Sequence, residues 1–172
     1  MDFFRIGLIG AGSIGTRHIK AIDEVAHIEL VAVADPSPAA RSLGDSRNIE
    51  VFADAESMLS ETDVEAVIIA TPTERHHADV MTALKYRKTV LVEKPITATM
   101  KEADEVTRYA AEQECQVLVG HQRRYYPCAR MARDIIPSGR IGRLRAVSGQ
   151  WATRKDDDYY AAAWRRERTA GP

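Results

Sequence analysis

Three glycines within six residues near the start of the chain constrain its fold more than any other feature. The motif Gly10-Ala11-Gly12-Ser13-Ile14-Gly15 follows the apolar run 4–9 and opens a helix-like pattern over 13–24. In such a turn the first glycine allows a tight bend, the second lets backbone approach a pyrophosphate, and the third lets the helix pack closely on the strand. Free N–H groups and the positive dipole end of the helix favour phosphate. The residues expected to line a dinucleotide site are Gly10, Gly12, Ser13, Ile14 and Gly15.

The first 120 residues alternate short apolar runs with amphipathic stretches. Strands are expected over 4–9, 28–34, 49–52, 64–70, 89–92 and 117–119. Helices are expected over 13–24, from Ser37 to a stop at Gly44, around Met58-Leu59, over 74–86 and over 100–113. Each crossover must return the chain to the same end of the sheet. The pattern therefore predicts an α/β fold, a doubly wound parallel sheet with helices on both faces.

Asp35 is the acidic partner that a dinucleotide-binding loop needs. It ends the second expected strand, 20 residues after Gly15, where a carboxylate accepts hydrogen bonds from the adenosine ribose. A 2′-phosphate at that position would meet like charge, so NAD is expected and NADP is less favoured, although Arg41 lies nearby. The alternative is that Asp35 only initiates the turn Asp35-Pro36-Ser37-Pro38.

The net charge of −1 conceals two regions of opposite sign. Residues 1–120 hold 12 Lys and Arg against 20 Asp and Glu, whereas residues 121–172 hold 12 against 5. We expect a boundary there, with a dinucleotide-binding domain over 1–120 and a second region over 121–172. The basic end either forms a solvated face or meets an anionic ligand or partner.

Composition excludes several other classes of protein. No apolar stretch approaches the roughly 18 residues of a membrane-spanning helix, and the first residues lack the pattern of a secretory signal. Cys115 and Cys128 lack metal-ligand spacing, so no metal site is expected. The arginines of 123–154 have the spacing of helix and strand surfaces and precede three aspartates, which argues against nucleic-acid binding. We expect a cytoplasmic protein that binds neither nucleic acid nor membrane.

Four further motifs identify a family resemblance. They are Thr71-Pro72-Thr73-Glu74-Arg75-His76, Glu93-Lys94-Pro95, Gly120-His121-Gln122-Arg123-Arg124-Tyr125-Tyr126-Pro127 and Ile141-Gly142. With the glycine loop, their order and spacing resemble the Gfo/Idh/MocA family of nicotinamide-dependent oxidoreductases. Trp151, Tyr159-Tyr160 and Trp164-Arg165 are similar to substrate-domain segments of some members. The resemblance covers essentially the whole chain and implies a Rossmann domain, NAD as cofactor and a sugar or polyol substrate.

The resemblance also implies roles for individual residues. Thr71 and Pro72 would line the path to the nicotinamide, and Glu93 and Lys94 would lie at the same sheet edge. Hydride leaves a carbinol carbon as the hydroxyl loses its proton, so the Lys94 ammonium would stabilise the alkoxide or relay the proton. The alternative for a Glu-Lys pair at a strand end is a solvated surface pair.

Histidines are candidates of a weaker kind. His76 matches a family position and is a candidate catalytic residue, but it shares a helical stripe with Val80, so a half-buried structural histidine competes with that role. His18 is expected to pack or cap near the cofactor loop. Possible substrate contacts are His121, Arg124, Tyr160, Trp164 and Arg165.

The last 52 residues resemble the start of a second, substrate-binding α/β domain that supports homo-oligomers in the full-length enzymes. We expect a helix over 127–136, a turn over 138–142 and a strand over 143–153. Because the family's general acid/base comes from a later part of that domain, we expect a truncated dehydrogenase that is weakly active or inactive alone. The alternative function is a non-catalytic NAD-binding sensor or regulatory module.

Overall fold

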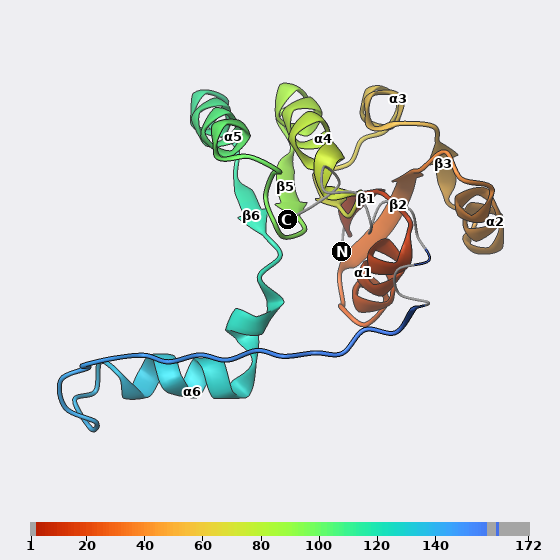
Figure 1. Ribbon diagram of the computed structural model, residues 1–172. Coiled ribbons are helices and arrows are strands. Elements are labelled where there is room, and N and C mark those ends of the chain that lie inside the picture. Colours follow the sequence, from red (N-terminus) through yellow and green to blue (C-terminus); the bar gives the residue numbers. More distant parts are fainter. Residues whose placement is uncertain (1–2, 158–160, 162–172) are drawn as a thin grey trace. The chain divides into compact units, whose positions relative to one another are not determined.

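Six parallel strands form the sheet in the computed structural model, which describes residues 3–157 and 161 (Figure 1). The strands are β1 (Phe4–Ile9), β2 (Ile28–Ala34), β3 (Glu50–Phe52), β4 (Ala66–Ile69), β5 (Thr89–Val92) and β6 (Val117–Val119). Their order in the sheet is β3-β2-β1-β4-β5-β6, with every neighbouring pair parallel. This is the doubly wound order predicted from the alternation, and its direction reverses between β1 and β4.

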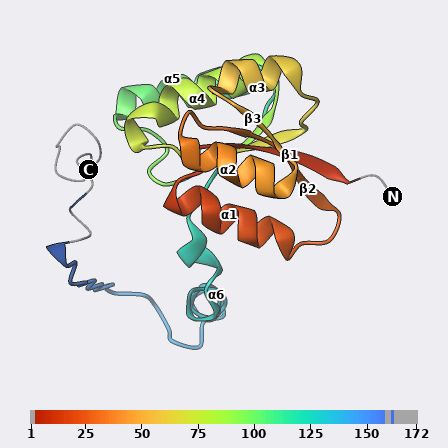
Figure 2. The same ribbon diagram turned by 90° about the vertical axis from the view of Figure 1, so that its right-hand side faces the viewer.

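Five helices cover the sheet in two layers (Figure 2). They are α1 (Ser13–Asp23), α2 (Pro38–Arg47), α3 (Ala55–Glu61), α4 (Thr73–Lys85) and α5 (Met100–Glu112). Apolar residues of α1 and α2 pack with one core cluster, and those of α3, α4 and α5 pack with the other. The two layers follow from right-handed crossovers that proceed in opposite directions from β1.

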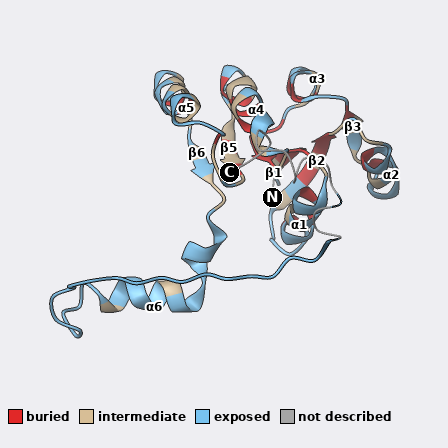
Figure 3. Cartoon of the chain, in the orientation of Figure 1, coloured by how far each residue is buried: buried red, intermediate tan, exposed pale blue. Residues whose placement is uncertain are grey.

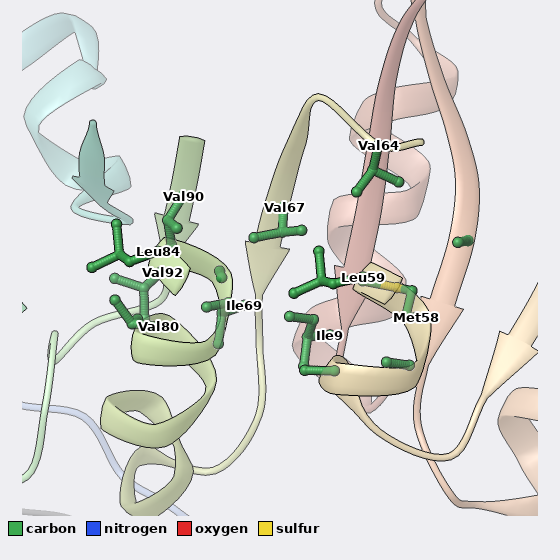
Figure 4. Packing of buried hydrophobic residues seen from close by; sticks show 14 of the residues in the cluster. Ile9, Met58, Leu59, Val64, Val67, Ile69, Val80, Leu84, Val90 and Val92 are labelled. Atoms are coloured by element: carbon green, nitrogen blue, oxygen red, sulfur yellow. The ribbon is translucent and has the colours of Figure 1, made fainter. Parts of the chain in front are cut away.

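The core lies where the strands are apolar on both faces (Figure 3). All four residues of β4 are buried, as a central parallel strand requires. The larger cluster joins these strands to α3 and α4, and Figure 4 shows Met58, Leu59, Val80 and Leu84 in it. Each fully buried side chain of this size contributes about 1.5–3 kcal/mol.

Gly44 does not end α2, so that sequence prediction is wrong. The helix continues to Arg47, and Asn48 takes the left-handed conformation that closes it, with φ 55°. A Cβ at Gly44 would collide with the Val51 side chain and lie 2.7 Å from the Ile49 carbonyl oxygen. Gly44 thus permits close contact between helix and strand, while Asn48, whose short polar side chain tolerates this conformation, provides the stop.

Residues 121–157 belong to a second compact unit of the chain. They form a 3-10 turn, η1 (Gln122–Tyr125), and one helix, α6 (Pro127–Ile135). The strand predicted over 143–153 is not formed, which corrects the sequence analysis. A strand needs a neighbour for its hydrogen bonds, and none is present among the described residues of this unit. Most of its side chains are exposed, and the Arg123 guanidinium stacks 3.7 Å from the Trp151 ring centroid.

None of the helices in the described part of the chain is long and apolar enough to cross a membrane.

Candidate functional site

Backbone hydrogen bonds align the predicted site residues along one edge of the sheet. Just past the carboxyl end of a strand, a backbone N–H donates to the last carbonyl oxygen of the neighbouring strand. Such bonds run from Asp35 to Phe52, from Gly10 to Ala34 and from Ala70 to Ile9. Continuing along the edge, Glu93 N–H donates to Ile69 and Gly120 N–H to Val92, all over 2.8–2.9 Å. The glycine loop, the acidic residue and the Glu93-Lys94-Pro95 segment therefore follow adjacent strands. Ligands of open α/β sheets bind at this edge, beside the strand-order reversal.

The three glycines of the loop differ in what surrounds them. Gly10 has φ +92°, and a Cβ there would lie 2.8 Å from the backbone of Ala70 and Thr71. At Gly15 a Cβ would collide with the Gly10 carbonyl oxygen, because α1 packs directly on the loop. A Cβ at Gly12 would meet nothing within 4 Å. Packing of the chain thus demands the first and third glycines, while the second leaves open space at the start of the helix.

The N-terminus of α1 offers its N–H groups to an anion. Gly12 is the N-cap residue, and no side-chain hydrogen bond caps the helix in the described structure. Ser13 and Ile14, which open the helix, are both exposed. The exposed helix end has positive charge, and the space beside the Cα of Gly12 is open in the described structure. Both features fit the pyrophosphate of a dinucleotide.

Asp35 is tied to the glycine loop and to the turn that follows it. One carboxylate oxygen accepts from the Ala11 N–H over 2.8 Å, and the other accepts from the Ser37 N–H over 2.8 Å. Burial raises the pKa of Asp35, but the bonds from Ser37 and Ala11 outweigh it and hold the pKa below its ordinary value of 3.8. The carboxylate stays ionised and, with two lone pairs on each oxygen, retains acceptor capacity for ribose hydroxyls.

Thr71 and His76 form a buried network at the end of β4. The Thr71 hydroxyl donates to Asp79 over 2.8 Å, and Arg75 donates to the other oxygen of that carboxylate over 3.2 Å. His76 is 1% exposed. Its Nδ1 lies 2.7 Å from the Pro95 carbonyl oxygen and its Nε2 lies 2.9 Å from the Thr71 carbonyl oxygen. The His76 ring is thus enclosed between two loops, and both of its nitrogens face backbone.

Glu93 is held by a histidine from α1. Its Oε1 lies 2.9 Å from His18 Nε2, and its Oε2 accepts from the Lys94 N–H over 3.2 Å. The bond from His18 lowers the pKa of Glu93, and with the Lys94 N–H it outweighs burial, so the pKa lies below its ordinary value of 4.5. A Cβ at Gly120 would lie 3.1 Å from this carboxylate, so the chain passes close above it.

Lys94 has a different environment from its neighbours. Its side chain is exposed, whereas Glu93 and Pro95 are half-buried. Within residues 3–157 the Lys94 ammonium makes no hydrogen bond or ion pair. Its charge helps to lower the pKa of Glu93, and the exposed side chain can approach a ligand oxygen at the sheet edge without first breaking a hydrogen bond to residues 3–157.

The remaining predicted residues lie at the start of α4, in the unit beyond residue 120 or outside the described residues. Pro72 is exposed at the N-cap of α4. His121 and Arg124 are exposed in the unit beyond residue 120, where the Arg124 N–H donates to the His121 carbonyl oxygen over 3.0 Å. Tyr160, Trp164 and Arg165 lie outside the described residues.

Sequence reasoning missed Asp79, the bond between His18 and Glu93, and the closeness of Gly120 to that carboxylate. A signal existed for Asp79, which follows His76 by three residues on a helix and therefore shares its face. No local pattern connects His18 to Glu93, since 75 residues separate them.

Comparison with known proteins identifies this arrangement. The profile of a family described as "Oxidoreductase family, NAD-binding Rossmann fold" matches residues 4–121. The chain belongs to this Gfo/Idh/MocA family. The match contains the glycine loop, Asp35 and the Glu93-Lys94-Pro95 segment, and thus the whole sheet edge described above.

Individual Gfo/Idh/MocA proteins are similar over most of this chain. The rhizopine catabolism protein MocA of Rhizobium meliloti is 35% identical over 152 residues, which are 88% of this chain and 48% of that protein. Inositol 2-dehydrogenase of Rhizobium meliloti (strain 1021) is 33% identical over 84% of this chain and 44% of its own length. The chain thus spans about half the length of the curated relatives it matches.

A solved structure has the same fold. The scyllo-inositol dehydrogenase of Lactobacillus casei, with bound NAD(H) and scyllo-inositol, superposes with a TM-score of 0.78 at 28% identity. The superposition covers 82% of this chain and 43% of that one.

Proposed function

We propose that this chain binds NAD and provides the cofactor side of an oxidoreductase that acts on a sugar, a polyol or a related carbinol. The observation that carries the proposal is the alignment of three elements on one sheet edge: the open loop at Gly12, the ionised Asp35, and the exposed side chain of Lys94. The first two fit the pyrophosphate and ribose of a dinucleotide. The third supplies a cation where a reacting oxygen would need one.

Membership of the family supports NAD as the cofactor. Asp35 favours NAD over NADP, because an ionised carboxylate accepts hydrogen bonds from two ribose hydroxyls and repels a 2′-phosphate. Its depressed pKa keeps that charge in place at neutral pH. When bound, NAD would accept or return hydride at its nicotinamide ring.

Lys94 is the residue that we assign to the proton step. As hydride leaves the carbinol carbon, negative charge builds on its oxygen, and a nearby ammonium stabilises that charge or transfers the proton. Thr71 and Pro72 lie at the end of β4, beside the strand that leads to Lys94, and are assigned to the path toward the nicotinamide. The relatives named for inositol place cyclic polyols first among substrates to test.

We also propose that residues 121–172 belong to the substrate side of the protein. The relative with 35% identity matches 152 residues, more than the family profile covers, so the similarity extends beyond residue 121. His121, Arg124, Tyr160, Trp164 and Arg165 remain the substrate-contact candidates in this region.

Titration calorimetry with NAD and NADP tests the cofactor proposal directly. We expect NAD to bind more tightly than NADP, and Asp35→Ala to reduce that preference. Turnover of an inositol panel, monitored through NADH absorbance, tests the reaction, and Lys94→Ala should lower it about 10²- to 10⁴-fold. Failure of the chain to bind NAD would overturn the cofactor proposal.

A further inference from the structure

The two residues that flank Lys94 are each held by a histidine from a different helix. Glu93 contacts His18 of α1 through its carboxylate, and Pro95 contacts His76 of α4 through its carbonyl oxygen. The apolar residues of α1 and α4 belong to the two separate core clusters, so the two helices cover opposite faces of the sheet (Figure 2). The segment is therefore held from both helical layers.

On the α1 side, the contact is a hydrogen bond between the His18 ring and the Glu93 carboxylate. The side chains of His18 and Glu93 are 20% and 18% exposed, and the nitrogen and oxygen are 2.9 Å apart. The other Glu93 oxygen accepts the Lys94 N–H, so the same carboxylate connects His18 to the backbone of Lys94. Bonds to an ionised acceptor are about twice as strong as neutral ones. The orientation of the Lys94 backbone thus depends on a residue of the glycine-loop helix.

On the α4 side, the contact is buried and has two ends. His76 faces the carbonyl oxygens of Thr71 and Pro95, which lie on the loops after β4 and β5. A neutral imidazole donates to one of these oxygens, and a protonated ring donates to both. In either form the ring fills the space between the loops, so it fixes their separation.

We propose that His18 and His76 are positioning residues that together hold the Glu93-Lys94-Pro95 segment and thereby aim the Lys94 ammonium. Nε2 of His18 and Nδ1 of His76 are engaged with the segment itself, and Nε2 of His76 is engaged with the Thr71 carbonyl oxygen. Lys94, between two restrained residues, is the exposed one with an unengaged head group. Restraint at both neighbours limits the directions that a long side chain can take, which is how a protein orients a flexible cation for a reaction. This proposal rests on the proposed function only for the role of Lys94 in the reaction.

The test follows the Lys94 ammonium directly in the chain without cofactor. Lysine amines are labelled by reductive ¹³C-methylation, and the Lys94 NMR signal is assigned by its loss in Lys94→Arg. His18→Phe keeps a ring and removes the donor, whereas His18→Gln keeps an N–H donor for Glu93. His76→Phe and His76→Gln do the same on the other side. The matched control is His77→Phe, since His77 is the next residue of α4 and contacts Glu105 of α5, 3.1 Å away.

We expect the Lys94 signal to shift in His18→Phe and in His76→Phe, to return toward its original position in His18→Gln and in His76→Gln, and to stay unchanged in His77→Phe. The double variant His18→Phe/Glu93→Gln should shift the signal no further than Glu93→Gln alone, since the ionised acceptor that His18 holds is already gone. If His76→Phe and His76→Gln do not fold, the His18 and Glu93 variants decide the question.

The proposal is overturned if Lys94 keeps its signal in His18→Phe, or if His77→Phe produces an equal shift. A separate NAD titration of the unsubstituted chain tests the proposed function. Absence of NAD binding would overturn that function and leave the Lys94 measurement intact, so the two failures can be distinguished.

Discussion

The two halves of the sheet edge are built in different ways. The glycine loop and Asp35 are connected through backbone groups: Asp35 accepts from the N–H groups of Ala11 and Ser37, and Gly15 packs on the Gly10 carbonyl oxygen. The Lys94 segment is held by side chains from distant helices, His18 and His76. A dinucleotide's phosphates and ribose need fixed donors and acceptors, which backbone provides. A reacting oxygen needs one mobile charge brought to a defined place, which side-chain contacts can adjust.

The largest expected effect comes from Lys94. Lys94→Ala should lower turnover about 10²- to 10⁴-fold, the range for loss of a general acid or base, because the charge that would stabilise the reacting oxygen is removed. NAD affinity should change little, since the glycine loop and Asp35 are untouched. The measurement is steady-state turnover alongside calorimetry. Equal turnover with the alanine variant would remove Lys94 from the mechanism.

Two glycines of one loop should respond differently to alanine. Gly15→Ala places a Cβ against the Gly10 carbonyl oxygen, so the free energy of unfolding should fall by about 1–3 kcal/mol, as for overpacked cores. Gly12→Ala meets no neighbour, so stability should be retained while NAD affinity drops, since the methyl group occupies the space for pyrophosphate. Thermal unfolding and NAD titration of both variants separate the two effects. Equal destabilisation by both would contradict this assignment.

Asp35 should govern the choice between the two cofactors. Asp35→Ala removes the ribose acceptor and the bonds to Ala11 and Ser37, so NAD affinity should fall about 10- to 100-fold, the equivalent of about one hydrogen bond to a charged group. NADP affinity should rise relative to NAD, because the like charge is gone. Asp45→Ala, on exposed surface of α2, serves as the control. A preference for NADP in the unsubstituted chain would contradict the role of Asp35 as the residue that selects NAD.

The smallest effect should be on the pH dependence of stability. Asp35 and Glu93 both have depressed pKa values, so their contribution is present above the ordinary values of 3.8 and 4.5 and is lost as pH falls through the lower folded values. Urea unfolding between neutral pH and pH about 3 should show this loss. Glu93→Gln should flatten the Glu93 part of the curve and leave the Asp35 part. A variant curve parallel to the original would argue against the bond between His18 and Glu93.

Most of the fold could be predicted from local patterns. Each strand of the sheet, and the helices between them, appeared as an apolar run or an amphipathic stretch, since burial on both faces leaves a continuous apolar signal. The failures were also local. Gly44 was interpreted as a helix stop, although a glycine inside a helix can equally allow a strand to approach. The strand over 143–153 was predicted from alternation alone, which does not show whether a partner strand is present.

The candidate site divides in the same way. The sequence by itself determined the glycine loop, the acidic residue after β2 and the lysine after β5, because these depend on short spacings and on the rule that parallel strands end at one edge. Only the tertiary structure decided that His18 holds Glu93 and that His76 joins two loops. Those contacts join α1 and α4, from opposite faces of the sheet, to the same short segment. The distances between these residues are set by packing, which no spacing along the chain encodes.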